Sequence, residues 1–584
     1  MTITRGRHVI QSGFQFLRQR MDDFYAGNAG ILGDRYFGGN FTGAPDSDFY
    51  LGMLNTTSQY FPTIAGGTGE PAWGQRSSIF GAYGQDNWRA MPGLELNYGL
   101  RYQAHTPWTE AHGEQLNYDP VSGQPLYPAG SALPPVTFPG LAPVASSNRA
   151  LYDGYYGIED FEPRLGFAYT TDGGQGKFVF RGAYTVSDYL EGTGNALRPT
   201  LNIPFNIQMQ LDNFCSGGTA GCNPAQLLIT NPLTINTSNL FVGAILNLWA
   251  PNVRPAVAQQ WNLTLQREID PSTAFEVAYV GQHSTHLMVP ESLLQLHMLP
   301  NGTTVPSPYL AGNPDLTSTV SYVTATYSDG NAAYNGLQAV FQRHMANGLE
   351  GQISYAWSHC LTNSIGFYGD VGQASNASAY WQNLYDPGTE WGSCYFDLHN
   401  NLTAHAVYNL PFGRGRQLAS HFNRVTNAVI SHWTVAGIYT FRGGFPLTAV
   451  DATDYSGTNS RGERADCLGP VHYEKLRTIS GVQWVNPDTY ANPQNGTFGT
   501  CGVSTLRGPG MDDVDLSLQR DFPTFESQRL EFRAEGINAL NHPIFNAPNM
   551  YCSGAAGAAC SAGFGLIGST QGERNLQFAL KYYF

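Results

Sequence analysis

Two histidine-containing segments hold the residue types that catalysis or metal binding uses. His283 and His286 in "HSTH" could form half of a metal site, but they stand where a strand pattern ends and a long loop begins, so we interpret them as ordinary loop histidines. His359 precedes Cys360, a spacing that suggests a base beside a nucleophile. Neighbouring residues on a strand point to opposite faces, so this pair also predicts no catalytic site.

Two groups of aspartates raise the question of calcium. The segment "DATDYSGTNSRGERAD" carries Asp451, Asp454 and Asp466, and oxygen-rich loops can bind calcium. The segment lacks the D-x-[DN]-x-[DN]-G order, which favours a solvated loop. A second group stands where a strand leaves a loop and is interpreted as a carboxylate cluster at a rim: Asp512, Asp513 and Asp515. Glycine-rich runs such as "GGTGEPAWG" follow no strand-to-helix junction and are not phosphate loops. We therefore expect no enzyme, no bound metal and no cofactor.

Eight cysteines fall as near neighbours in the sequence. None forms a C-x-x-C motif, and no spacing matches a zinc site. Each neighbouring pair brackets a stretch rich in Gly, Asn and Ser, which suits a disulfide across a loop in an oxidising compartment. Connectivity does not follow from sequence alone, so free or differently paired thiols remain alternatives. The candidate disulfide cysteines are Cys215 with Cys222, Cys360 with Cys394, Cys467 with Cys501, and Cys552 with Cys560.

Alternation of apolar and polar residues predicts the elements that would carry these side chains. The last segment, "NLQFALKYYF", places Leu576, Phe578, Leu580, Tyr582 and Phe584 on one face of a strand. The same period of two, interrupted by short turns, recurs in hairpins throughout the chain. About 14 strands are predicted, without an amphipathic helix between them, so a parallel α/β sheet is excluded. The clearest segments are residues 77–104, 162–186, 261–281, 334–360, 402–410, 433–441, 514–518, 530–534 and 575–584.

The connections alternate between short and long. Turns within the hairpins have two to six residues, whereas the links between hairpins are long: roughly residues 105–160, 188–256, 284–331, 360–398 and 443–510. Structureless loops of this length count against a compact soluble domain. They are typical of an outer-membrane barrel, with short periplasmic turns and long extracellular loops.

Composition agrees with a barrel. Of 584 residues only 13% are charged, while 13% are aromatic and 67 are glycine. The mean hydropathy of −0.26 resembles that of a soluble protein, but barrel strands alternate lipid-facing and lumen-facing residues and keep the mean near neutral. The net charge of −14 excludes the basic surface that nucleic acid requires. The first residues, "MTITRGRHVIQSGFQF", show no secretory signal, which predicts either a cytosolic protein or a start that lies upstream.

The face opposite the apolar stripe carries charges that we expect to face the lumen. A sandwich would also have one polar face, but aromatic residues near strand ends, the loop asymmetry and the terminal strand favour a barrel. The fold class is therefore all-β, an antiparallel transmembrane β-barrel. The charges hold a plug by salt bridges or line a solute path, or they simply pair and solvate within the lumen. They are Glu95, Arg101, Glu276, Glu350, Arg533 and Glu535.

Eight segments, in order, resemble the barrel of TonB-dependent outer-membrane transporters, and the resemblance is greatest to the Oar-like group abundant in Acidobacteria-type genomes. It covers residue 5 to Phe584 and includes "GAYGQDNWRAMPGLELNYGLRYQ", "YNGLQAVFQRHMANGLEGQISYAWS" and "RLEFRAEGINALNHPIFNAPN". It implies a 22-stranded barrel with an N-terminal plug and a TonB box. Neither part is recognisable here, so we expect residues 1–584 to be one barrel domain, truncated at its N-terminus, without a separate plug.

The resemblance also implies a function and partners. We expect a receptor or transporter in the outer membrane of a Gram-negative bacterium, taking up a large or scarce solute such as an oligosaccharide, a peptide or a metal chelate. TonB is a partner only if the missing N-terminal part exists. The alternatives are a structural or adhesive surface barrel and a passive pore. Membrane lipid and the unknown solute are the other expected partners, and nucleic acid is not.

The last residues resemble the β-signal that the barrel assembly machinery reads. Leu580, Tyr582 and the terminal Phe584 carry this resemblance. An ordinary edge strand at a soluble C-terminus is the alternative. Deleting Phe584, or changing it to Asp, is expected to lower insertion of the full-length protein. The measurement is its amount in the outer membrane, and an unchanged amount would refute the assignment.

Overall fold

The structure is a computed structural model, and every structural statement below concerns the residues that it describes. These are residues 1–24, 32–38, 41–42, 44–61, 72–133, 136–138, 140–190, 198–212, 228–230, 240–241, 244–314, 320, 322–365, 378–414, 416–418, 421, 423–451, 453–525, 528–561 and 563–584. Cys215 and Cys222 lie outside them.

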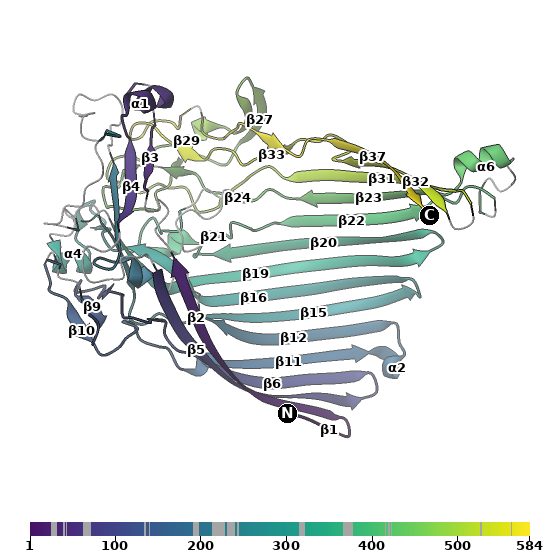
Figure 1. Cartoon of the computed structure of the whole chain (residues 1–584), viewed down its shortest axis with the longest axis horizontal. Coiled ribbons are helices and arrows are strands. Elements are labelled where there is room, and N and C mark those ends of the chain that lie inside the picture. Colours follow the sequence, from purple (N-terminus) through teal and green to yellow (C-terminus); the bar gives the residue numbers. More distant parts are fainter. Residues whose placement is uncertain are drawn as a thin grey trace.

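One large antiparallel sheet forms the body of the protein (Figure 1). The part of the chain that the structure describes contains fourteen strands of nine residues or more, which agrees with the number predicted from alternation. Each pairs with the next along the chain. They are β2 (His8–Phe24), β5 (Ala72–Met91), β6 (Leu94–His105), β11 (Phe161–Thr170), β12 (Phe178–Tyr189), β15 (Ala256–Asp270), β16 (Thr273–Ser292), β19 (Tyr322–Ala346), β20 (Leu349–Thr362), β22 (Asn400–Asn409), β23 (Trp433–Arg442), β31 (Met511–Pro523), β32 (Arg529–Ile537) and β37 (Asn575–Tyr583).

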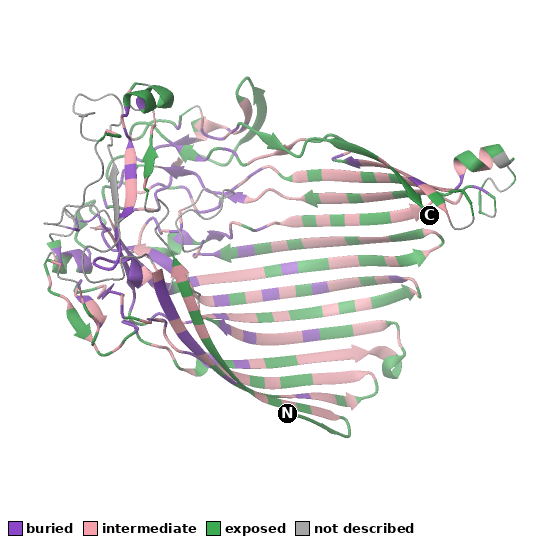
Figure 2. Ribbon diagram, in the orientation of Figure 1, coloured by how far each residue is buried: buried purple, intermediate pink, exposed green. Residues whose placement is uncertain are grey.

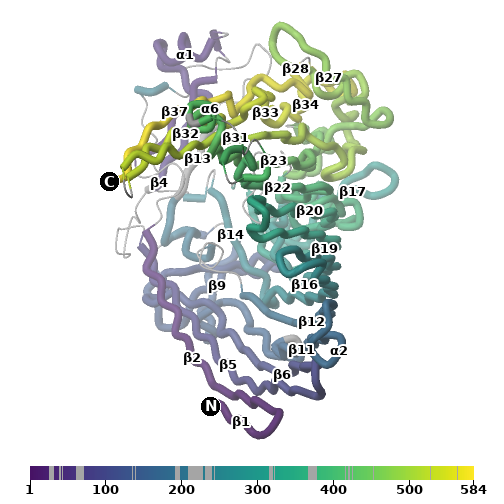
Figure 3. Tube along the Cα trace, turned by 90° about the vertical axis from the view of Figure 1, so that its right-hand side faces the viewer, coloured from purple at the N-terminus to yellow at the C-terminus, as the bar shows by residue number. Residues whose placement is uncertain are grey.

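The sheet curves into an arc (Figure 3). At one end the short strand β1 (Thr2–Arg5) pairs with the start of β2, and at the other end β37 pairs with β32. Among the described strands, no pairing joins β37 to β1 or β2. The arc therefore presents two edges, β1 with the rest of β2 on one side and β37 on the other.

The two faces of the sheet differ in chemistry, as the alternation predicted, and Figure 2 shows that the degree of burial changes from residue to residue along the strands. One row of directly paired residues, Leu263, Tyr279, Leu337 and Trp357, has side chains that are 41–58% exposed. Such a row of large exposed apolar groups suits lipid rather than water. The opposite face is polar along the strands, and at its loop end Trp73 is buried against a connecting segment.

Short turns join the strands at one end of the sheet (Figure 1). Between β19 and β20 the turn is Asn347–Gly348, where φ is 55° and 83°, and positive φ at both positions is the requirement of a type I′ hairpin turn. One connection departs from the prediction of short turns. Residues 410–432, between β22 and β23, include the helix α6 (Arg424–Ile430) and project from this end.

The long connections gather at the other end and contain small elements. The small strands are β3 (Asp34–Tyr36), β4 (Thr56–Phe61), β7 (Thr109–Glu110), β8 (Asn117–Tyr118), β9 (Pro125–Pro128), β10 (Val144–Ser146), β13 (Ile207–Asp212), β14 (Ile245–Trp249), β17 (His297–Met298), β18 (Thr304–Val305), β21 (Gly392–Ser393), β24 (Pro446–Leu447), β25 (Val450–Asp451), β26 (Asp466–Cys467), β27 (Tyr473–Thr478), β28 (Gly481–Val485), β29 (Tyr490–Ala491), β30 (Leu506–Arg507), β33 (Ile544–Phe545), β34 (Tyr551–Cys552), β35 (Leu566–Ile567) and β36 (Thr570–Gln571). The helical turns are α1 (Pro45–Leu51), α2 (Thr171–Gly174, in a hairpin turn), α4 (Pro308–Gly312), η1 (Ile158–Asp160), η2 (Arg198–Leu201), η4 (Pro387–Glu390) and η5 (Pro487–Thr489).

Two of the predicted loop boundaries were wrong. The predicted loop 284–331 is shorter, because β16 continues to Ser292 and β19 begins at Tyr322. These extensions pair with each other across register shifts, which keeps the ladder hydrogen-bonded although the alternation is broken. A further difference is that β14 pairs in parallel with β19, so the sheet is antiparallel except for this short segment.

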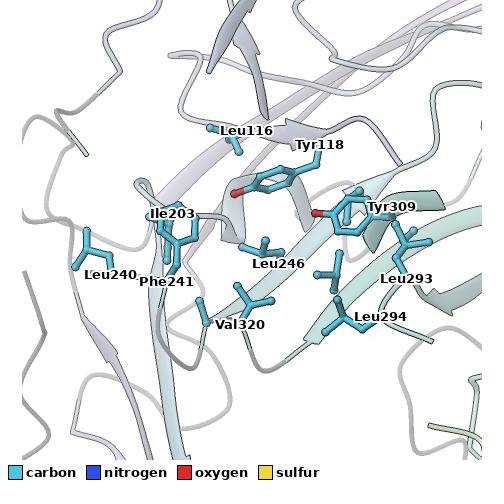
Figure 4. Packing of buried hydrophobic residues seen from close by; sticks show 14 of the residues in the cluster. Leu116, Tyr118, Ile203, Leu240, Phe241, Leu246, Leu293, Leu294, Tyr309 and Val320 are labelled. Carbon is cyan, nitrogen blue, oxygen red and sulfur yellow. The ribbon is translucent and has the colours of Figure 1, made fainter. Parts of the chain in front are cut away.

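Apolar residues of the connections pack into several cores of their own, of which two are the largest among the described residues. The first loop core lies around fully buried Leu246 (Figure 4) and consists of Leu116, Tyr118, Ile203, Phe205, Ile207, Leu240, Phe241, Ala244, Leu246, Leu248, Leu293, Leu294, Tyr309, Leu310, Val320, Val323 and Ala325. The second loop core consists of Leu447, Ala449, Ala465, Val485, Tyr490, Cys501, Leu506, Met550, Cys552, Cys560 and Phe564. In the described residues, no helix has the length and apolar character needed to span a membrane.

Candidate functional site

The predicted lumen charges share the polar face of the sheet. The strand register places all six opposite the exposed apolar rows. Several have ion-pair partners on the same face: Arg181 of β12 lies 3.8 Å from Glu276 of β16, and Arg533 lies 2.9 Å from Glu531 and 3.5 Å from Glu535 within β32. Pairing within the face is thus seen for some of the charges, while their role in a solute path stays a prediction.

A denser polar network joins residues of β2, β6, β11 and β12 near the loop end of this face. The Arg101 side chain donates to Gln15 across β5 and lies 3.5 Å from the Glu162 carboxylate. Gln103 donates to Asp188 over 2.7 Å, and the same carboxylate lies 3.2 Å from His105. The groups of β6, β11 and β12 are buried or half-buried, so their hydrogen bonds fix the relative positions of these three strands.

A pocket of about 480 Å³ opens beside this face, between β16, β19 and β20. Gln282, Tyr334 and Cys360 come from one row of paired residues, and Thr362 and Phe396 add to the wall. Gln260 donates to the Gln282 amide oxygen, which holds that side chain in place. The volume lies within the range of ligand pockets, and the lining combines apolar surface with a few fixed polar groups, as binding of an organic solute requires.

Three of the four candidate disulfides lie among the described residues, and each joins the neighbours in sequence. Cys360 is bonded to Cys394, Cys467 to Cys501, and Cys552 to Cys560. Cys360 and Cys394 line the pocket, and the other four cysteines lie in or against the second loop core. Two of the disulfides therefore close a loop within one connection, whereas the Cys360–Cys394 bond fastens the connection after β20 back to the end of that strand.

The connections 363–399 and 443–510 meet at a buried ion pair. Arg464 lies 2.7 Å from the Glu390 carboxylate, and their side chains are only 5% and 3% exposed. Arg464 also donates to the Cys501 carbonyl, and its own amide donates to the Gln382 side chain. The Gln382 backbone amide in turn donates a hydrogen bond to the Glu390 carboxylate, so both charged groups of the ion pair also have hydrogen-bond partners. We call Glu390, Arg464 and Gln382 the loop joint.

A second carboxylate is buried in the connection 443–510. Burial raises the pKa of Glu463 from 4.5 to about 8, and a hydrogen bond with Asp454 contributes to the same shift. Asp454 accepts hydrogen bonds from Ser456 and from the amides of Gly457 and Asn459, which hold its carboxyl group in place beside Glu463. Glu463 is accordingly a proton-binding group in the folded loop at neutral pH.

The Glu463→Gln variant is expected to remove a pH dependence of this loop. The folded loop binds a proton that the unfolded chain releases above pH 4.5, so stability falls by up to about 1.4 kcal/mol per pH unit as pH rises from about 4.5 to 8. Glutamine keeps the neutral shape and should hold amide-exchange protection of residues 443–510 constant across this range. Glu474→Gln, at an exposed position of the same connection, is the control. Equal pH dependence in Glu463→Gln and the wild type would contradict the assignment.

The remaining sequence candidates do not converge on one site. His283 and His286 lie within β16 and not in a loop, so that part of the prediction was wrong; a register shift follows Ser284, and φ of His286 is 58°. The aspartates of the 451–466 segment have separate partners, since Asp451 accepts from Thr453 and Asp466 from Thr500. The rim aspartates lie in β31: Asp512, Asp513 and Asp515.

The terminal strand has the predicted faces. Leu580 and Tyr582 of β37 are 66% and 52% exposed, and Phe584 follows the strand at 96%. Lys581 pairs with Glu531 on the other face. Recognition of these residues as a β-signal stays a prediction.

Comparison with known proteins identifies the family. Residues 1–577 match the family described as outer membrane beta barrel domain. No curated protein matches the sequence. Similar solved structures include the outer membrane transporter YddB of Escherichia coli (9% identity, TM-score 0.45, 100% of this chain and 53% of that one), the FrpB iron transporter of Neisseria meningitidis (9%, 0.41, 99% and 53%) and the ferric-catecholate import receptor Fiu of E. coli K12 (10%, 0.41, 100% and 53%). The chain spans about half the length of each of them.

Proposed function

This chain belongs to the outer membrane beta barrel domain family and lies in the outer membrane of a Gram-negative bacterium, and from this premise we propose that it takes up a large or scarce solute. The pocket beside Gln282 and Tyr334 carries the proposal. It lies on the polar face, where a solute leaving the long connections would next arrive. An oligosaccharide, a peptide or a metal chelate suits a wall that mixes amides, hydroxyls and aromatic rings.

The finer proposal is an Oar-like, TonB-dependent mechanism. In such a mechanism a plug rests against the charged polar face, and TonB, drawing on the inner-membrane proton gradient, displaces it. The barrel itself must be closed in lipid, because the backbone groups on the free edges of β2 and β37 would otherwise lack hydrogen-bond partners. We propose that residues 1–584 form one barrel domain and that further strands pair with these edges in the membrane.

Uptake by intact cells tests the proposal. Cells are supplied with a panel of labelled oligosaccharides, peptides and metal chelates. We expect cells with the gene to accumulate one of these solutes and cells without the gene not to accumulate it. An uncoupler should abolish this difference. Accumulation that is unchanged by the uncoupler would indicate a passive pore. Attachment of the solute to the cell surface without accumulation would indicate an adhesive barrel. Either outcome overturns energised uptake.

A matched pair of variants assigns the pocket. Tyr334→Ala removes a ring from the pocket wall, whereas Tyr279→Ala removes a ring from the opposite face of the neighbouring strand. The first is expected to lower accumulation at equal amounts in the outer membrane, and the second to leave it unchanged. Equal accumulation by the two variants would show that the solute does not bind in this pocket.

A further inference from the structure

A cluster of two histidines and an aspartate lies at the loop end of β20, and none of its three side chains lines the pocket. His359 belongs to β20, and Asp397 and His399 lie just before β22. The two histidine side chains are about half exposed, at 46% and 45%, while the Asp397 side chain is fully buried. The cluster is therefore open to the medium on one side and anchored in the protein on the other.

Three potential ligand atoms converge in this cluster. His399 Nε2 lies 3.0 Å from His359 Nδ1 and 3.2 Å from Asp397 Oδ2, and His359 Nδ1 lies 3.3 Å from the same oxygen. Zinc binds imidazole nitrogen and carboxylate oxygen at about 2.0–2.2 Å, so two ligands of a tetrahedral ion lie about 3.3–3.6 Å apart. The triangle is already close to the size of one face of such a tetrahedron.

The Asp397 carboxylate is also held through atoms other than Oδ2. Asp397 Oδ1 accepts the Cys360 amide over 2.7 Å, and the Asp397 amide donates to the Cys394 carbonyl. Cys360 and Cys394 are bonded to each other by a disulfide and by a backbone hydrogen bond. This support fixes the aspartate relative to β20, as a positioned metal ligand requires.

Arg507, from β30 in the connection 443–510, supplies the positive charge at this point. Its Nη2 lies 2.5 Å from Asp397 Oδ2 and 2.7 Å from His399 Nε2. Its Nη1 donates to the Asp397 carbonyl over 2.9 Å. The guanidinium thus contacts two of the three ligand atoms, and its side chain, 24% exposed, has a path to solvent.

We propose that His359, Asp397 and His399 form a binding site for a divalent transition-metal ion of the zinc and copper class, in exchange for the Arg507 guanidinium. The two imidazoles and one carboxylate are ligands that such ions prefer over calcium or magnesium. A water completes the tetrahedron on the exposed side. When the ion enters, the guanidinium leaves the cluster, because two cations cannot share Asp397 Oδ2 and His399 Nε2.

Exchange with Arg507 gives the site a recognisable signature. Removing the arginine charge removes the competitor, so Arg507→Gln should bind metal more tightly than the wild type. Removing a ligand should weaken binding, so His399→Ala should bind less tightly. Loss of folding cannot mimic an increase in affinity, and the opposite signs therefore separate the metal site from a purely structural ion pair.

The experiment titrates Co²⁺ and Zn²⁺ into the purified, disulfide-intact full chain in detergent. Co²⁺ is followed by its visible absorption and Zn²⁺ by calorimetry. We expect one ion per chain, an affinity at least tenfold higher in Arg507→Gln and at least tenfold lower in His399→Ala. The double variant Arg507→Gln with His399→Ala should lose the gain. His472→Ala, a histidine in the same connection as Arg507, is the control and should bind as the wild type does.

Two results would overturn the proposal. One is an Arg507→Gln chain that binds no more tightly than the wild type, which would show that the cluster is an ion-pair network fastening the connection to the rim. The other is equal binding by Arg507→Gln and the double variant, which would place the ion elsewhere. Heat-modifiable gel mobility verifies that each variant is folded before titration.

Discussion

Replacing Glu390 with alanine is expected to destabilise the loop joint by about 3–5 kcal/mol, because Arg464 would keep a buried charge without its carboxylate partner. The remaining hydrogen bonds of Arg464, to the Cys501 carbonyl and through its own amide to Gln382, are to neutral groups and do not replace the lost charge. The connections 363–399 and 443–510 should then separate locally while the sheet stays folded.

Amide exchange of the two connections measures this effect. Glu390→Ala should raise exchange rates in residues 378–399 and 443–510 and leave those of β15 and β16 unchanged. The double variant Glu390→Leu with Arg464→Met removes both charges and should be closer to the wild type, because well-packed apolar groups often replace a buried pair at little cost. Glu474→Ala, an exposed position in β27, is the control. Unchanged exchange in Glu390→Ala would show that the Glu390–Arg464 ion pair does not hold the two connections together.

The strands could be predicted because each has two chemically different faces. In β15, for example, Leu263 and Leu265 belong to the apolar face, and Asn262 and Thr264 belong to the polar face. The same rule fails at the loop end of β16, where Pro290 and the left-handed His286 interrupt the pattern although the backbone still pairs with β19. Alternation with a period of two thus predicts the part of a strand that has a lipid-facing side. It does not predict the part of the same strand that extends beyond the lipid-facing region.

The sites were less predictable because their members come from distant segments. Glu390 and Arg464 are 74 residues apart, and nothing in either local sequence shows that they meet. His359 is conspicuous beside Cys360, but its partner His399 is 40 residues away, and no local pattern connects the two. The disulfides are the exception, since each described pair brackets a single connection, the longest separation being 34 residues.

Replacing Leu263 with arginine is expected to lower the free energy of unfolding in a bilayer by about 2–4 kcal/mol. Leu263 lies near the middle of β15, is 56% exposed and belongs to the apolar row that contacts lipid in the membrane. A guanidinium there must be transferred from water into hydrocarbon. Reversible urea unfolding of the full-length protein from lipid vesicles measures the difference.

Asn262→Arg is the matched control, because it places the same side chain one residue away on the polar face. Its effect is expected to stay below about 1 kcal/mol, since lumen substitutions change selectivity more than stability. The difference between the two variants reports which face contacts lipid, and it does so without any assumption about the solute. Equal destabilisation by both arginines would mean that the two faces see the same environment, and a soluble sheet buried on neither side would then describe this chain better than a membrane barrel.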